Sequence, residues 1–247
     1  MAFYRATFYA NRFNMDYEFN IILPDDLKPG EKIPTLFLLH GYLGNHQQWM
    51  RFSSIERYSW RKRMAIVMPE GQNGFYIDHV DGHPYFQALI DLMEHVRTVF
   101  PLSDTREDTY VAGLSMGGYG AFKWALTHPE LFSKAASLSG ALDILRTKQA
   151  MIEDPKRYHA KSMFGDIDLT QSDNNLYVLL NKHLKEKNPL PELFIACGTE
   201  DFLFEESVDM HQFLTSHNLK HHYIESPGDH NWDYWDQYIQ DVIDWLK

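Results

Sequence analysis

Residues 113–117, Gly-Leu-Ser-Met-Gly, constrain the fold of this chain more than any other segment. The residues before them, 108–112, are rich in β-formers and predict a buried strand, whereas residues 118–126 have helical spacing and end just before Pro129. A strand, a tight turn and a helix form the context in which a G-x-S-x-G serine stands above a sheet at a helix N-terminus. Glycine is needed on both sides, because a side chain there would collide with neighbouring backbone. The alternative is a glycine turn without chemistry, since G-x-S-x-G also occurs by chance.

Length and composition fit one large α/β domain that spans residues 1–247, because 247 residues with 44% hydrophobic content can bury a full core. The formal net charge of -11 repels phosphate backbones and anionic membranes, so we expect neither nucleic acid nor membrane as a partner. The single cysteine, Cys197, excludes an internal disulfide and permits a reducing compartment. No signal-like apolar run follows Met1 and no stretch is long enough to span a bilayer, so the expected location is cytoplasmic.

Strand and helix patterns alternate along the chain and predict a doubly wound, mainly parallel sheet. Residues 3–9 and 17–23 predict an antiparallel strand pair at the N-terminus. Further strands are expected at residues 35–39, 65–68, 134–139, 192–197 and 221–225, and further helices at residues 86–100, 205–217 and 234–246. Residues 143–190 are less regular and more polar, so we expect a cap-like insertion over the C-terminal ends of the strands, where such sheets bind ligands.

A reactive serine at position 115 needs a base, and the base needs a carboxylate that orients it. In hydrolases with this turn, the acid and then the histidine follow the serine along the chain. The loop after the strand at 192–197 carries Glu200 and Asp201. We expect Asp201 to be the acid, with Glu200 as its competitor and a helix cap as the non-catalytic alternative for Asp201. His230 lies on the loop before the last helix and is the expected base.

Acyl transfer also needs two backbone donors for the negative charge that develops on the carbonyl oxygen. One is expected at the amide directly after the serine, that of Met116. The other is expected at Tyr42, within the segment Leu-His-Gly-Tyr-Leu-Gly-Asn at residues 39–45, where Gly41 permits a close turn. Taken alone, this segment is also compatible with a plain turn at the end of a strand.

Aromatic side chains near these loops are candidates to line a substrate pocket, and three are selected as substrate-binding residues: Trp49, Tyr76 and Trp232. The segment Asp-His-Val-Asp-Gly-His at residues 78–83 contains metal-ligand residue types without a defined geometry, so no metal site is expected there. Cys197 lies within a predicted strand and is expected to be a buried small hydrophobic residue. No cofactor is expected.

Several motifs together carry a family resemblance, namely residues 39–45 with Trp49, 113–120, 139–142, 197–203 and 230–235. They resemble the esterase D-like group of α/β-hydrolases and look most similar to the bacterial tributyrin esterases. The similarity runs through nearly the whole chain. It implies the α/β-hydrolase fold and a cytoplasmic carboxylesterase for short acyl chains, sometimes active on acetylated sugars and often a homo-oligomer. Carried over by motif, it supports the catalytic triad Ser115, Asp201 and His230 with the oxyanion donors Tyr42 and Met116.

The expected activity is therefore that of a serine carboxylesterase, which acts on a small-molecule ester through an acyl-enzyme intermediate. The alternatives are an acetylated-sugar or feruloyl esterase, an S-formylglutathione-type thioesterase, and a non-catalytic binding protein with a hydrolase fold. S-formylglutathione hydrolases usually carry Ser-Gly-Leu-Thr-Cys where this chain has His-Gly-Tyr-Leu-Gly at residues 40–44, which weakens the thioesterase alternative. All three triad residue types are present in the expected order, which argues against a non-catalytic protein.

Overall fold

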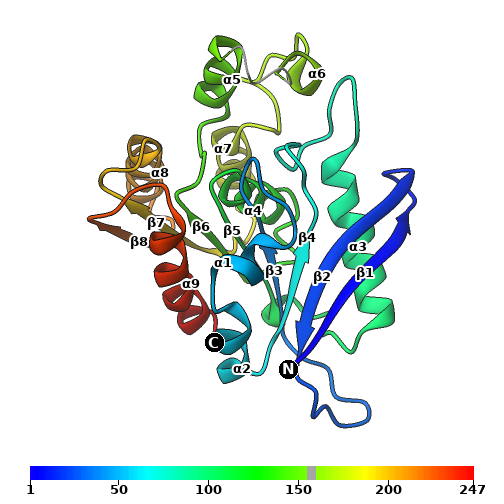
Figure 1. The fold of residues 1–247 in the computed structure, drawn as a ribbon. Helices are drawn as coiled ribbons and strands as arrows, with labels where there is room; N and C mark the ends of the chain where they lie inside the picture. Colours follow the sequence, from blue (N-terminus) through cyan, green and yellow to red (C-terminus); the bar gives the residue numbers. More distant parts are fainter. Residues whose placement is uncertain (155–159) are drawn as a thin grey trace.

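A single eight-stranded sheet forms the centre of the computed structural model, which describes residues 1–154 and 160–247 (Figure 1). The strand order is β1-β2-β4-β3-β5-β6-β7-β8. β1 (Ala2–Ala10) and β2 (Met15–Leu23) pair antiparallel, and β2 also runs antiparallel to β4. All other neighbouring strands pair parallel. The predicted mainly parallel sheet with an antiparallel N-terminal pair is confirmed.

The parallel strands lie close to their predicted positions: β3 (Thr35–Leu39), β4 (Ala65–Pro69), β5 (Thr109–Leu114), β6 (Lys134–Leu138), β7 (Glu192–Gly198) and β8 (His221–Ser226). Every residue of β3, β4 and β5 is buried. Continuous burial on both faces explains why these strands are continuous apolar runs and do not alternate with polar residues. β8 lies at the edge of the sheet and is correspondingly more exposed.

Helices cover both faces of the sheet (Figure 1). One apolar layer includes α3 (Tyr85–Val99), α4 (Met116–Thr127), α7 (Leu176–Glu186) and α8 (Phe204–Ser216). The opposite layer includes α1 (Gln48–Phe52), α2 (Ile55–Lys62) and α9 (Trp232–Leu246). A short 3-10 turn, η1 (Arg106–Asp108), precedes β5. Within β3, Phe37 faces the first layer whereas Leu36 and Leu38 face the second, because successive side chains of a strand point to opposite faces.

The predicted insertion at 143–190 begins shortly after β6, which ends at Leu138, and it is more regular than its sequence indicated. Besides α7 it contains α5 (Ile144–Glu153) and α6 (Ala160–Phe164). The side chains of Asp143 and Asn175 accept backbone N–H bonds from the first turns of α5 and α7, so two N-cap signals were present in the sequence. Residues 155–159 of the insertion lie outside the described residues. In Figure 1, α5 and α6 stand at the end of the molecule opposite both chain termini.

Candidate active site

The turn between β5 and α4 is sharp and is built around Ser115. Its φ of 54° and ψ of -119° lie in a region that non-glycine residues rarely adopt. A Cβ atom added at Gly113 would lie 2.3 Å from the Gly117 carbonyl oxygen, and one added at Gly117 would lie 2.5 Å from the Leu39 oxygen. Only glycine therefore allows the chain to pass at these two positions, which accounts for the G-x-S-x-G pattern.

Ser115, His230 and Asp201 come from separate loops and meet in space. His230 Nε2 lies 3.0 Å from Ser115 Oγ. His230 Nδ1 lies 2.8 Å from Asp201 Oδ2 and 3.0 Å from Oδ1. Because an ionised carboxylate can only accept, Nδ1 carries the donated proton, which leaves Nε2 to accept the serine hydroxyl proton. This is the arrangement in which an imidazole can take a proton from a serine as it attacks.

The Asp201 side chain is fully buried and held from several sides. Besides the imidazole, it accepts the Leu203 N–H at 2.8 Å. Burial would raise the pKa of this carboxyl, but the contacts with His230, the Leu203 N–H and Ser139 outweigh burial and hold the pKa below its usual range. The group is therefore ionised near neutral pH, as is required to orient an imidazole and stabilise its charged form.

Glu200, the alternative acid, faces away from the imidazole. Its carboxylate accepts the Gly228 N–H and the Thr199 hydroxyl. A Cβ atom added at Gly198 would lie 2.2 Å from the Gly228 oxygen, so the loop after β7 and the loop before α9 touch through their backbones. Glu200 thus joins the acid-bearing loop to the histidine-bearing loop, and the structure brings Asp201 to His230 instead.

The segment that we name the oxyanion loop, residues 40–46, runs beside the serine. A Cβ atom added at Gly41 would lie 3.4 Å from Ser115 Cβ. The Gly44 N–H donates to the Gly41 carbonyl at 3.1 Å, which forms the tight turn that contains Tyr42. Met116 is the first residue of α4, so its N–H has no carbonyl partner within the helix. The two donor-bearing segments are adjacent, and the roles of the Tyr42 and Met116 amides stay predictions.

Two of the three predicted pocket aromatics are buried in the core, and their prediction as substrate-binding residues does not fit this placement. The Trp49 indole N–H donates to the Leu39 carbonyl at 3.0 Å. The Tyr76 hydroxyl donates to the His40 carbonyl at 3.1 Å. Both side chains therefore hydrogen-bond to the backbone where β3 ends and the oxyanion loop begins. The third, Trp232, is half-buried and packs edge-on against Trp49, and its contact with substrate stays a prediction.

Sequence reasoning missed two residues that contact Asp201 and His230. The Trp235 indole N–H donates to Ser139 Oγ at 3.1 Å, and the indole also packs edge-on against the His230 ring with centroids 4.9 Å apart. Ser139 in turn contacts Asp201 and helps to keep that carboxyl ionised. Ser139 directly follows β6, and its place at the C-terminal end of a central strand is the signal that could have drawn attention to it.

One exposed apolar side chain flanks the His230 ring and was also missed. The Phe202 ring is 70% exposed and lies with its centroid 4.5 Å from that of His230. A large apolar side chain with so much exposed surface next to the His230 imidazole is suited to contact the apolar part of a substrate.

The remaining candidates have structural roles. Asp78, within the loop with metal-ligand residue types, accepts the Phe86 and Gln87 N–H groups at 2.9 and 3.0 Å and caps α3. Within the described ranges, no group of three or more side chains is arranged to hold a metal ion. Cys197 is buried, and burial raises the pKa of its thiol to about 12. None of the helices in the described part of the chain is long and apolar enough to cross a membrane.

Comparison with known proteins identifies the family. A family model, Esterase ("Putative esterase"), matches residues 10–245. The chain belongs to this esterase family. An acetyl esterase from Caldicellulosiruptor saccharolyticus is 34% identical over 264 residues, which cover 100% of this chain and 98% of the relative.

Solved structures of two Staphylococcus aureus proteins share the fold of this esterase. One is FphF, a fluorophosphonate-binding serine hydrolase, with a TM-score of 0.93, 31% sequence identity, and coverage of 99% of this chain and 98% of that chain. The other is the S-formylglutathione hydrolase FrmB, with a TM-score of 0.90, 31% identity and the same coverage. The protein is therefore a carboxylic ester hydrolase with the α/β-hydrolase fold, and its substrate is a small-molecule ester.

Proposed function

We propose that this esterase is a serine carboxylesterase that hydrolyses short-chain acyl esters through Ser115, His230 and Asp201. The observation that carries the proposal is the 3.0 Å contact between His230 Nε2 and Ser115 Oγ, with Nδ1 of the same ring engaged by Asp201. The similarity to a fluorophosphonate-binding serine hydrolase supports a reactive serine as well.

The reaction proceeds in two acyl transfers. His230 takes the proton of Ser115 Oγ as this oxygen attacks the ester carbonyl carbon, and the Tyr42 and Met116 amides stabilise the resulting oxyanion. The carbon–oxygen bond to the alcohol then breaks, and His230 gives its proton to the leaving oxygen. Water next attacks the acyl-enzyme with His230 as base, which releases the acid and restores the serine. Asp201 keeps the imidazole oriented throughout, and no cofactor takes part.

The direct test replaces Ser115 with alanine. S115A removes the nucleophile, so hydrolysis of p-nitrophenyl acetate should fall by at least about 10⁴-fold, and a fluorophosphonate probe that labels the wild type should not label the variant. A circular dichroism spectrum and a melting temperature like those of the wild type would show that S115A is folded. Undiminished turnover by folded S115A would reject the proposal, and a wild type that neither turns over esters nor reacts with the probe would favour the non-catalytic alternative.

The short-chain preference rests on the resemblance to tributyrin esterases and on similarity to an acetyl esterase. We expect kcat/KM to be higher for p-nitrophenyl acetate and butyrate than for the octanoate and palmitate, and the reverse order would contradict this preference. Acetylated xylo-oligosaccharides, a feruloyl ester and S-formylglutathione complete the panel. S-formylglutathione is included because FrmB is 31% identical to this chain. The cytoplasmic location and the homo-oligomer stay predictions.

A further inference from the structure

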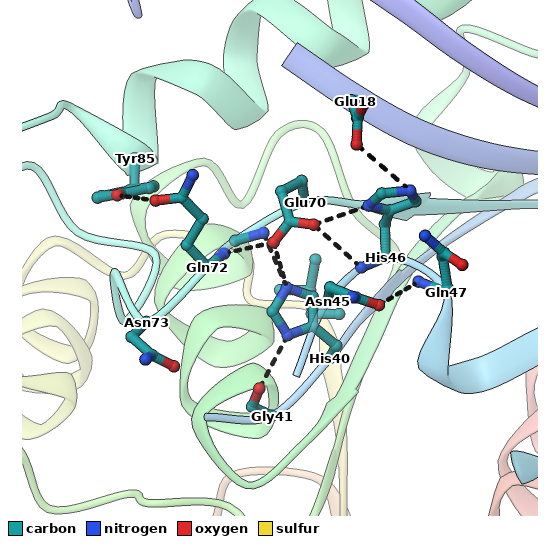
Figure 2. Close-up of polar contacts among 12 residues, drawn as sticks. Glu18, His40, Gly41, Asn45, His46, Gln47, Glu70, Gln72, Asn73 and Tyr85 are labelled. Carbon is teal, nitrogen blue, oxygen red and sulfur yellow. Dashed lines mark hydrogen bonds and ion pairs between the residues drawn. The ribbon is translucent and has the colours of Figure 1, made fainter. Parts of the chain in front are cut away.

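A polar network centred on Glu70 lies against the oxyanion loop (Figure 2). Glu70 directly follows β4, and its side chain is only 17% exposed. His46 Nδ1 lies 2.7 Å from Glu70 Oε2, and the Gln72 N–H lies 2.7 Å from Oε1. His40 Nε2 approaches Oε1 at 3.4 Å. Both histidines of the oxyanion loop therefore lie against one carboxylate.

Glu70 remains ionised in this setting. Burial would raise the pKa of its carboxyl, but the hydrogen bonds from His46 and the Gln72 N–H outweigh burial and hold the pKa below its usual range. A largely buried carboxylate persists in a protein only when its neighbours satisfy it. The groups that donate to Glu70 belong to two segments, the oxyanion loop and residues 70–73. The carboxylate therefore joins these two segments to each other.

The segment at residues 70–73 ties the oxyanion loop at three points, which lie on both sides of Tyr42. Because β3 and β4 are parallel neighbours, the segments that follow them emerge side by side. The three ties are the Gly71 N–H to His40 Nε2 at 2.8 Å, the Leu43 N–H to Asn73 Oδ1 at 2.7 Å, and His46 Nδ1 to Glu70 Oε2 at 2.7 Å.

The ring of His40 fixes the first of these ties. Its Nδ1 lies 2.8 Å from the Gly41 carbonyl, which can only accept, so Nδ1 carries the proton. Nε2 then accepts from the Gly71 N–H, and this bond is shorter than the approach to Glu70. One buried imidazole thus connects the backbone of the oxyanion loop to the backbone of the segment after β4.

The middle of the oxyanion loop borders a hollow. Residues 43–45 border a cavity of about 670 Å³, which Glu70 and part of β2 also line. Leu43 is largely exposed and has a φ of 64°, a left-handed conformation that a leucine keeps only when its surroundings hold it. Its N–H bond to Asn73 is one contact that does so, in addition to the turn closed by the Gly44 N–H and the Gly41 carbonyl.

We propose that Glu70 is a positioning residue for ester hydrolysis, which with Asn73 holds the oxyanion loop so that the Tyr42 N–H points at the developing oxyanion. The inference rests on the proposed function. Stabilisation of an oxyanion depends on donors fixed in advance, and a displacement of about 1 Å can cost on the order of 100-fold in rate. Glu70 acts through His46 and the loop and does not touch the substrate.

The test is Glu70→Gln. The amide keeps the shape but replaces one acceptor oxygen with N–H donors, so it cannot accept from both His46 and the Gln72 N–H, and the tie should loosen. We expect kcat for p-nitrophenyl acetate to fall by about 10- to 100-fold with KM changed by less than about 2-fold, because the loop acts on the transition state. The inhibition constant of phenylboronic acid, whose tetrahedral serine adduct occupies the oxyanion site, should rise by the same factor as kcat/KM falls.

Two further comparisons separate positioning from general stability. Asn73→Ala removes the acceptor for the Leu43 N–H, whereas Asn73→Asp keeps an oxygen there, so N73A should lower kcat and N73D should restore most of it. Glu18→Gln is the matched carboxylate control. Glu18 is 59% exposed and 3.8 Å from His46 Nε2, outside the three ties, so E18Q should keep wild-type kcat.

The outcomes distinguish this inference from the proposed function. If S115A is inactive while N73A, and E70Q where it folds, keep wild-type kcat and phenylboronic acid inhibition, the positioning role is wrong and the proposed function stands. If folded S115A retains turnover, the proposed function itself fails. If E70Q does not fold, the N73A and N73D pair decides the matter on its own.

Discussion

Glu200 and Asp201 are adjacent in the sequence, but their carboxylates contact different residues. Asp201 is buried against the His230 imidazole, whereas Glu200 binds the backbone of the neighbouring loop. Sequence reasoning favoured Asp201 but left Glu200 as a competitor, because two consecutive carboxylates differ only in the direction in which the backbone points them. That direction depends on the contact between the two loops, which no local pattern records.

Asp201→Asn should therefore be far more damaging than Glu200→Gln. The asparagine keeps the shape but cannot hold the imidazole in the required tautomer, so kcat should fall by about 10³- to 10⁴-fold. E200Q should lose less than about 10-fold, because only the link between the two loops is weakened. Steady-state kinetics with p-nitrophenyl acetate measure both effects, and the opposite ranking would transfer the acid role to Glu200.

Ser139 should set part of the pH dependence of the reaction. Its contact with Asp201 is one of the interactions that keep the pKa of this carboxyl below its usual range. Ser139→Ala should raise that pKa, so the loss of kcat/KM that follows protonation of Asp201, at the acid end of the profile, should begin at higher pH, with a loss of about 10-fold in kcat. An unshifted acid limb would show that Ser139 does not act on Asp201.

Among the secondary-structure elements, those with strong periodicity were predicted within a few residues, and short or irregular ones were not. α1 and α2 were missed because α1 has only five residues and α2 lies on the surface with little apolar content. The helices of the insertion were overlooked because its polar composition obscured the caps at Asp143 and Asn175. Each of these elements draws its stability from packing against the rest of the fold more than from its own sequence.

The junction between α5 and α8 contains a buried carboxyl with an unusual pKa. Glu206 on α8 accepts the Asp143 N–H at 2.8 Å, and burial raises the pKa of Glu206 to about 7. The pKa of a glutamate in an unfolded chain is about 4.3. Because the folded value is the higher one, the unfolded chain binds fewer protons between these two values, and stability is lost as pH rises through this window.

Glu206→Gln should remove the loss of stability that occurs as pH rises, because the glutamine does not ionise. It also keeps an oxygen acceptor for the Asp143 N–H. The melting temperature of E206Q relative to the wild type should therefore be higher at pH 8 than at pH 5. Glu205→Gln, a change at the exposed neighbour on the same helix, should show no such difference between the two pH values. A melting temperature difference for E206Q that is the same at both pH values would contradict the prediction.

For the molecule as a whole, the Glu70 network links the sheet to the loops above it. Tyr17 on β2 donates to the Glu70 carbonyl, and Asn20 on the same strand donates to the His46 carbonyl. The antiparallel pair at the N-terminus is thereby tied to the site by polar contacts. These contacts add to the backbone pairing that holds β2 between β1 and β4, so they join Glu70 and His46 to the sheet.

The acid stability of the whole molecule should therefore depend on Glu70. Its folded pKa lies below the unfolded value, so the stabilisation is complete above about pH 4.3 and is lost as pH falls below it. The free energy of unfolding, measured with urea, should be lower for E70Q than for the wild type at pH 7, and this gap should narrow toward pH 3. A gap that stays constant over this range would show that ionisation of Glu70 contributes nothing.

The succession of the eight strands, the turn at Ser115 and the residue types of the site followed from the sequence, because steric exclusion and periodicity act over a few neighbouring residues. Tertiary structure alone decided that Asp201 and not Glu200 meets His230, that Trp49 and Tyr76 are buried, and that Glu70 lies behind the oxyanion loop. These outcomes depend on which strands are neighbours in the sheet and on how loops distant in sequence pack together. Contacts of this kind are set by the fold as a whole, and no short segment contains them.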